Sequence, residues 1–177
     1  MEDLTPQPQP APEPPPERSR EPTLVAVPYP KALEGLQGCA LCQHMTAREI
    51  DVLVRVMESK HYSAGGVVKA SGSEATGVEV VMRGSLEVRL AAFAPRQLGP
   101  GSYHGGEAVF GAEASYYEVV ALEDTDVLAG TRLALMELLR SEPVLACKLL
   151  YALGVDLLGD LERARERLAA SASDAAS

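Results

Sequence analysis

The chain has 177 residues, 46% of them apolar, which is enough for one well-packed domain but not comfortably for two. Its 16 Lys and Arg residues face 25 Asp and Glu residues, and the formal charge of -9 would repel a phosphate backbone, which argues against nucleic-acid binding. No apolar run reaches the roughly 20 residues that a membrane span needs, and the first residues do not resemble a secretory signal. We therefore expect a cytoplasmic protein with no membrane span and no cofactor.

The chain starts with a proline-rich segment. Ten of the 13 prolines fall within the first 30 residues, so this stretch lacks many of the amide donors that helices and sheets require. We expect residues 1–30 to form a disordered tail, 31–169 a single domain and 170–177 a second disordered tail. A Pro-x-x-Pro ligand for an aromatic groove is the functional alternative for the first tail.

One C-x-x-C pair follows, made of Cys39 and Cys42, with His44 close behind. A zinc site would need two further ligands, a redox site would need a reactive thiol, and there is no second C-x-x-C. The odd total of three cysteines also argues against a disulfide framework. We favour a structural role for the pair and no metal, and we keep a metal or redox sensor built on it as an alternative. Cys147, inside an apolar helical run, is predicted to be a core residue.

A helix is predicted to start at Thr46. The stretch T-A-R-E places Glu49 three residues after Thr46, the spacing of a capping box, in which each side chain bonds the backbone amide of the other. Apolar residues then recur at the spacing of one helical face, at Ile50, Leu53, Val54 and Met57. This apolar stripe must pack on another part of the chain.

From His61 onward the pattern becomes that of short strands separated by glycines. Apolar residues alternate over 78–82 and again over 86–90, and the Gly84 turn between them predicts a hairpin. Further strands are expected within 96–101, 116–121 and 124–130. Closely spaced short strands with glycine turns favour an antiparallel β roll, that is, a jelly roll or double-stranded β-helix. The fold class predicted is therefore mainly β, with one helix before the roll and two after it.

Two helices are predicted at the C-terminal end. Thr131 can cap a short helix through Leu139, and Ser141 with Pro143 can start a longer one that runs to about Ala169. Apolar residues of the longer helix step by three and four, at Leu150, Leu153, Leu157, Leu161, Ala164 and Leu168. This row packs on the roll of its own chain or pairs with a second copy, so a homodimer through this helix is expected as one outcome.

The order of these elements resembles the cyclic nucleotide-binding domain family over about residues 35–165. Gly72 and Gly84 stand at the expected glycines, and L-G-P-G-S-Y is similar to the approach to the family's phosphate-binding cassette. In that cassette, F-G-E-hydrophobic-A-L precedes Pro-Arg, a small residue and V-x-A. The resemblance implies that backbone amides and the Arg bind the cyclic phosphate while the Glu accepts from the ribose hydroxyl.

The residues that this resemblance assigns to the ligand depart from the family pattern. When the cassette is aligned to this sequence without a gap, Gly106 stands at the position of the Glu that binds the ribose. Ser115 stands at the position of the Arg that binds the phosphate, and the bulky Tyr116 follows it. A one-residue slip would place Glu107 at the ribose position, but no register supplies the Arg. Losing a charge-assisted contact costs about 1.5 to 3 kcal/mol. The candidate ligand-binding residues are Tyr103, His104, Gly105, Gly106, Glu107, Ala108, Ser115 and Tyr116.

We therefore expect a stand-alone regulatory module that is not an enzyme, with weak or lost binding of cyclic mononucleotides, acting through a protein partner. The main alternative is a sensor for a cyclic nucleotide or dinucleotide. In that case backbone amides and Ser115 would bind phosphate oxygens, and Tyr103, Tyr116 or Tyr117 would stack on a base. A purely structural explanation of the two adjacent tyrosines is that one faces the core and the other faces solvent.

Overall fold

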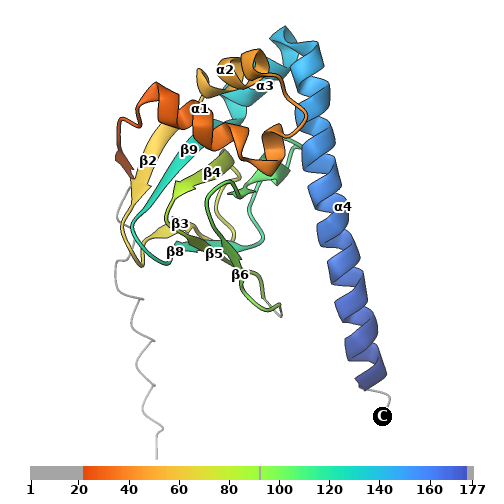
Figure 1. The fold of residues 1–177 in the computed structure, drawn as a ribbon. Helices are drawn as coiled ribbons and strands as arrows, with labels where there is room; N and C mark the ends of the chain where they lie inside the picture. Colours follow the sequence, from red (N-terminus) through yellow and green to blue (C-terminus); the bar gives the residue numbers. More distant parts are fainter. Residues whose placement is uncertain (1–21, 92, 175–177) are drawn as a thin grey trace, which may run out of the picture.

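A computed structural model describes residues 22–91 and 93–174, and the side chains of 170–174 are not part of that description. In this part of the chain, an antiparallel β roll carries helices at one end and one long helix along its side (Figure 1). The roll with flanking helices that the sequence predicts is thereby confirmed.

The described strands form two antiparallel sheets that face each other across the roll. The first sheet has the order β1 (Thr23–Leu24), β2 (Glu58–Tyr62), β9 (Thr125–Thr131), β4 (Gly77–Arg83) and β7 (Tyr103–His104). The second has the order β3 (Val67–Lys69), β8 (Glu118–Ala121), β5 (Leu86–Arg89) and β6 (Arg96–Leu98). Strands distant in sequence therefore become neighbours, as β9 pairs with both β2 and β4.

The helices precede and follow the roll. They are α1 (Tyr29–Gln37), the single turn η1 (Ala40–Cys42), α2 (Ala47–Val54), the single turn η2 (Gly106–Ala108), α3 (Arg132–Ser141) and α4 (Pro143–Asp174). The predicted caps are present: Thr46 and Glu49 form the capping box of α2, and the Thr131 hydroxyl accepts from the Ala134 amide at α3. Within the described residues, every helix is too short or too polar to cross a membrane.

Regular structure starts earlier and ends later than expected. Thr23–Leu24 pairs with β2, and α1 starts at Tyr29 because Pro30 lies in its first turn, where a missing amide donor costs nothing. At the other end, α4 continues to Asp174 instead of ending near Ala169. The predicted 170–177 tail is thus helical as far as it is described. The rest of both predicted tails, residues 1–21 and 175–177, lies outside the described residues.

The predicted hairpin around Gly84 is wrong. β4 pairs with β7 and β9, whereas β5 pairs with β6 and β8 in the other sheet. Gly84 has φ 84°, and a Cβ there would lie 2.6 Å from the Asp124 carbonyl oxygen, so the chain turns tightly against the neighbouring segment and crosses between sheets. Alternation of apolar residues detects the two strands but not which strands they pair with.

Two groups of buried residues form the core. One fills the roll between the sheets and includes Leu86, Val119 and Val127. The other lies between the first sheet and the helices and includes Leu36, Leu53, Leu128, Leu145 and Leu149. Because the first half of α4 belongs to this second group, the long helix is anchored to the roll, and its later turns lie beside the segment 103–107.

Candidate functional site

A cavity of about 670 Å³ lies between the roll and α4. Its walls come from the β5–β6 connection, from β7 and η2, from the two residues just before β8 and from the outer turns of α4. This volume falls within the range of small-molecule sites. The cavity therefore places the glycine-rich turn of the candidate cassette opposite a helix.

Two adjacent glycines shape the inner end of this cavity for different reasons. Gly105 has φ 88°, and a Cβ there would overlap the carbonyl oxygen of Gly77, so both its conformation and its contact exclude a side chain. A Cβ on Gly106 would lie only 2.8 Å from the Leu153 side chain of α4. One glycine thus lets the turn form against β4, and the next lets α4 approach it closely.

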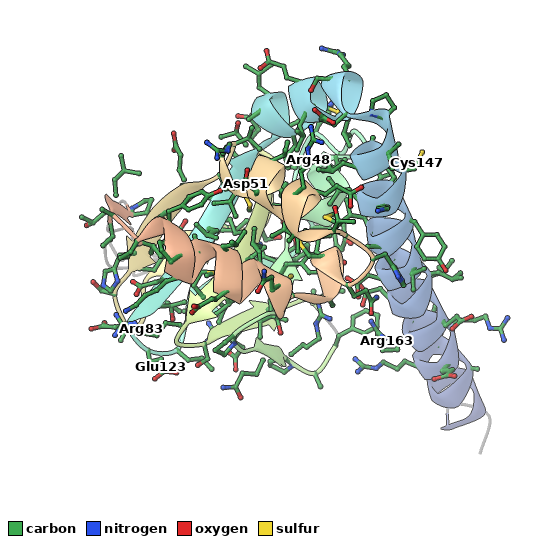
Figure 2. All side chains as sticks on the ribbon, turned by 45° about the horizontal axis from the view of Figure 1, so that its top comes forward. Arg48, Asp51, Arg83, Glu123, Cys147 and Arg163 are labelled. Carbon is green, nitrogen blue, oxygen red and sulfur yellow. The ribbon has the colours of Figure 1, made fainter. Side chains whose placement is uncertain are left out.

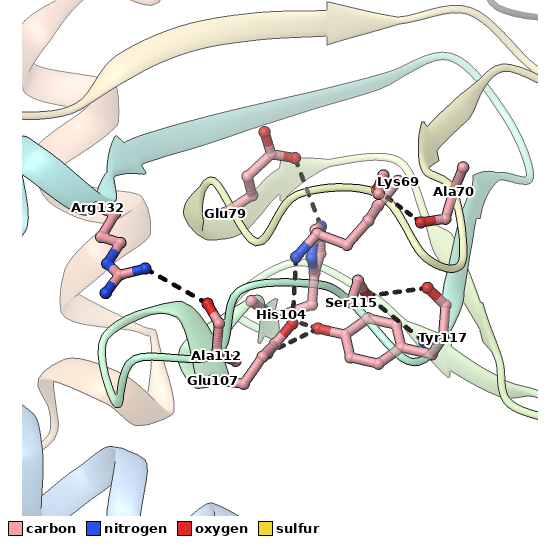
Figure 3. Close-up of polar contacts among 11 residues, drawn as sticks. Lys69, Ala70, Glu79, His104, Glu107, Ala112, Ser115, Tyr117 and Arg132 are labelled. Atoms are coloured by element: carbon pink, nitrogen blue, oxygen red, sulfur yellow. Dashed lines mark hydrogen bonds and ion pairs between the residues drawn. The ribbon is translucent and has the colours of Figure 1, made fainter.

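Behind the glycines, a buried polar network fills the turn (Figure 3). Lys69 Nζ lies 3.2 Å from Glu107 Oε1, and the Tyr117 hydroxyl donates to Glu107 Oε2 at 3.0 Å. The same hydroxyl accepts a 2.9 Å hydrogen bond from the Gly105 amide. Lys69 and Glu107 side chains are only 6% and 10% exposed. The network joins β3, η2 and the residue before β8, and its members are one another's partners.

The electrostatics of the network keep Tyr117 protonated. Burial raises the pKa of its phenol, and the adjacent Glu107 carboxylate raises it further. Lys69 also lies 5.4 Å from the centre of the Tyr117 ring, so the ammonium contacts both the carboxylate and the aromatic face. The phenol is therefore a fixed donor to Glu107 and a fixed acceptor for Gly105.

A second buried cluster surrounds Glu79. Its carboxylate accepts from Lys60 at 3.1 Å and from the Tyr62 hydroxyl at 3.1 Å, and His104 Nε2 lies 3.4 Å away. The His104 ring is buried and has no partner with hydrogen-bond geometry among the described residues, although the ion-pair distance to Glu79 is short (Figure 3). This histidine therefore lies beside Glu79 in the interior of the roll.

Six of the eight candidate ligand-binding residues line the cavity: Tyr103, His104, Gly105, Gly106, Glu107 and Tyr116. The other two, Ala108 and Ser115, are buried away from it. The Ser115 hydroxyl, the proposed replacement for the guanidinium, donates to the backbone oxygen of Tyr117 at 3.0 Å. It is therefore engaged within the chain and does not face the cavity.

One of the two adjacent tyrosines is buried and the other is exposed, as the purely structural explanation predicts. Tyr117 is buried inside the roll, whereas Tyr116 is 55% exposed on the cavity wall. The pKa of Tyr103 is raised by burial and then by the charge of Asp156, which lies on α4 at the same cavity. The charge of Asp156 on α4 therefore acts on the phenol of β7.

The cysteine pair lies in the core. Cys39, just before η1, and Cys42, its last residue, are both buried, and burial raises the pKa of their thiols to about 11 and about 12. The His44 ring packs edge-on against Tyr151. Among the described residues, no three potential ligands gather at one point. The prediction for Cys147 is wrong, since Figure 2 shows it on the side of α4 that faces away from the roll.

Several residues of the cavity and of the buried network behind it were not predicted from the sequence. Lys69 lies 38 residues before its partner Glu107, and Arg96, Arg163 and Arg167 reach the cavity from β6 and α4. The sequence does contain one indication of the ion pair, because Lys69 and Glu107 are charged residues next to apolar ones. Lys69, for example, follows two valines in the strand V-V-K. A charge in a buried strand needs a partner, but its position in sequence does not say which.

No family model matches the sequence, and no curated protein matches it. Solved structures do match. The catabolite activator protein of Thermus thermophilus is 24% identical with a TM-score of 0.63, over 73% of this chain and 63% of that one. A cyclic nucleotide-binding domain of Methylobacillus flagellatus is 19% identical with a TM-score of 0.65, over 78% of this chain and 81% of that one.

A third similar structure is the sensor domain of the transcriptional regulator DNR from Pseudomonas aeruginosa. It is 16% identical, with a TM-score of 0.59 over 76% of this chain and 93% of that one. The architecture is thus that of a β-roll domain with a cavity covered by its last helix. At these identities the likeness establishes the fold, and the chain has the fold of the cyclic nucleotide-binding domains. The chain spans about 63% of the length of the Thermus protein.

Proposed function

We propose that this chain is a regulatory, non-catalytic module with the cyclic nucleotide-binding fold, in which binding of cyclic mononucleotides is weak or lost. The observation that carries the proposal is the hydrogen bond from the Gly105 amide to the Tyr117 hydroxyl. An amide at this glycine turn is the donor that a bound phosphate would use. Here the chain's own phenol already accepts from it.

The charges of the turn support the same conclusion. The cation nearest the turn, Lys69, is paired with Glu107 inside the roll. To bind a phosphate there, the chain would have to break this pair and the Tyr117 contacts, and an unpaired buried carboxylate would be left close to the anion. Ser115, aligned with the family's arginine, is buried and bonded to the backbone.

The test is a thermal-shift titration of the full chain with cyclic AMP and cyclic GMP up to millimolar concentration. A ligand at 100 times its dissociation constant would add about 2.7 kcal/mol to stability, an easily visible shift. We expect no shift with either compound. The proposal fails if a cyclic mononucleotide stabilises the chain at micromolar concentration, and AMP serves as the matched control for non-specific nucleotide binding.

For the output of the module, we propose contacts with a protein, and specifically with a second copy through α4. On the side of α4 that faces away from the roll, exposed apolar residues recur at steps of three and four and form what we call the α4 face. It consists of Val144, Cys147, Tyr151, Val155 and Leu158. Steps of this kind are typical of a helix that packs against another helix. These five residues do not line the cavity, so pairing would leave it accessible.

A further inference from the structure

The cavity walls are mainly apolar, although they are not packed by the chain itself. The roll side contributes Val88, Leu90 and Phe93, and α4 contributes Leu153, Leu157 and Leu161. Of these, Leu161 is 66% exposed, and only Leu153 is fully buried. Apolar side chains that surround about 670 Å³ of open space would gain from a ligand that removes them from water.

Two of the three acidic residues that line the cavity have cationic partners in the chain. Glu107 is held by Lys69 and Tyr117 at the inner end. On α4, Asp160 accepts a hydrogen bond from Arg163 at 2.6 Å, whereas Asp156 makes no ion pair with another described residue, and its charge raises the pKa of Tyr103. Figure 2 labels Arg163, which extends from α4 on the side of the roll. Asp156 thus leaves one unpaired carboxylate at the cavity, which two unpaired cations outnumber.

Two cations at the cavity, in contrast, lack a carboxylate. Arg96 comes from β6 and Arg167 from α4, and neither makes an ion pair with another described residue. The Arg167 guanidinium lies 5.3 Å from the centre of the Phe93 ring, so it is fixed against the apolar wall. Planar guanidinium groups bind carboxylates through two parallel hydrogen bonds.

From these observations we propose that the cavity binds a small apolar monocarboxylic acid, whose hydrocarbon body contacts the leucines of α4 and whose carboxylate is bound by Arg96 and Arg167. The inference rests on the proposed function, because it takes the glycine turn to be closed to a cyclic phosphate. It goes beyond that function in assigning a ligand class to the module: an organic anion recognised at the outer end of the cavity instead of a phosphate at the inner end.

The experiment is calorimetric titration of the full chain with decanoate and with decanol, which share a chain length and differ in charge. We expect decanoate to bind and decanol to bind roughly tenfold more weakly, the loss of one charge-assisted contact. Equal affinity of the two compounds, or no binding of decanoate to the folded chain at millimolar concentration, would overturn the inference.

Variants then locate the ligand. Replacing both cations, Arg96→Gln with Arg167→Gln, should weaken decanoate roughly tenfold and leave decanol unchanged. Arg165→Gln is the matched control, because Arg165 lies on the same helix and does not line the cavity. Leu157→Trp should fill the cavity and weaken both compounds. Unchanged decanoate affinity in the double variant would contradict the assignment, even if Leu157→Trp does not fold.

A competition arm separates this inference from the proposed function. If cyclic AMP displaces decanoate at micromolar concentration, the proposed loss of cyclic nucleotide binding is wrong, while the acid site remains. If neither compound binds, the ligand class is wrong, while the proposed loss stands. Binding of decanoate that cyclic AMP does not affect supports both.

Discussion

At the scale of single residues, the buried pair of Lys69 and Glu107 lies on the inner side of the glycine turn. Two charges this far from water are stable only as partners, since the effective cost of burying either one alone is several kcal/mol. The Tyr117 hydroxyl adds a third member and ties the pair to the Gly105 amide. The turn keeps the backbone form of an anion site, but its Gly105 amide is already bonded to the Tyr117 hydroxyl.

The first prediction concerns this ion pair. Lys69→Met should lower the free energy of unfolding by about 3 to 5 kcal/mol, because Glu107 then keeps a buried charge without a partner. Lys69→Met combined with Glu107→Gln should cost clearly less than the sum of the two single changes. Urea unfolding of the four proteins measures this, and additive costs would contradict the coupling.

The second prediction concerns the phenol. Tyr117→Phe removes one hydroxyl and leaves the buried Gly105 amide without its acceptor, which should cost about 1 to 3 kcal/mol. Tyr116→Phe, at the exposed neighbour, is the matched control and should change stability by less than about 0.5 kcal/mol. If both variants have the melting temperature of the unchanged protein, the Tyr117 hydroxyl does not stabilise the turn.

At the scale of elements, one carboxylate links the first turn of α2 to α4. Glu49 completes the capping box with Thr46, and Lys148 of α4 donates to both of its carboxylate oxygens at 2.8 Å. These two helices belong to the same core group above the first sheet. The cap is therefore also a tertiary contact, which the local pattern T-A-R-E could not indicate.

This contact predicts a pH dependence. Hydrogen bonding from Lys148, and then from Thr46, lowers the pKa of Glu49 from 4.5 to about 2. Because the folded pKa lies below the unfolded one, the contact contributes fully above the unfolded value and is lost as the pH falls through 4.5 toward 2. Urea midpoints measured across this range should fall less steeply for Lys148→Met than for the unchanged chain.

The control for this measurement is Arg48→Met, a cation on α2 that makes no ion pair with another described residue (Figure 2). It should keep the full pH dependence of the unchanged protein. If the urea midpoints of Lys148→Met and of the unchanged chain fall equally steeply with pH, the contact with α4 does not stabilise the ionised Glu49.

At the scale of the whole molecule, α4 serves two surfaces. One side closes the cavity over the roll, and the other carries the apolar α4 face. The proposed pairing predicts that Leu158→Glu halves the mass of the particle in solution, as measured by light scattering after gel filtration. A charge on an apolar helix contact is costly to bury, which is the reason for the expected dissociation.

Leu133→Glu is the matched control for this prediction, because Leu133 is a similarly exposed leucine on α3. Its mass should equal that of the unchanged chain. If the unchanged chain and both variants are monomers, α4 does not pair with a second copy. If Leu158→Glu is still a dimer, the dimer contact lies elsewhere on the molecule.

The sequence by itself determined the features that depend on neighbours in the chain. The capping box at Thr46, the helix capped by Thr131, the strands over 78–82 and 86–90 and the glycine turn before Glu107 all follow from spacing over a few residues. Such features are read from local periodicity because the same residues recur on one face or in one turn. The family resemblance rests on their order, and the fold confirms it.

Only the tertiary structure decided the contacts between distant segments. It showed that β4 and β5 lie in different sheets, that Lys69 and Tyr117 close the turn around Glu107, and that Cys147 faces outward. Pairing of this kind depends on which strands and helices meet across the roll, and a charged or polar residue carries no record of its partner's position. The ability of this cavity to hold a ligand is therefore set by tertiary contacts and not by the cassette sequence alone.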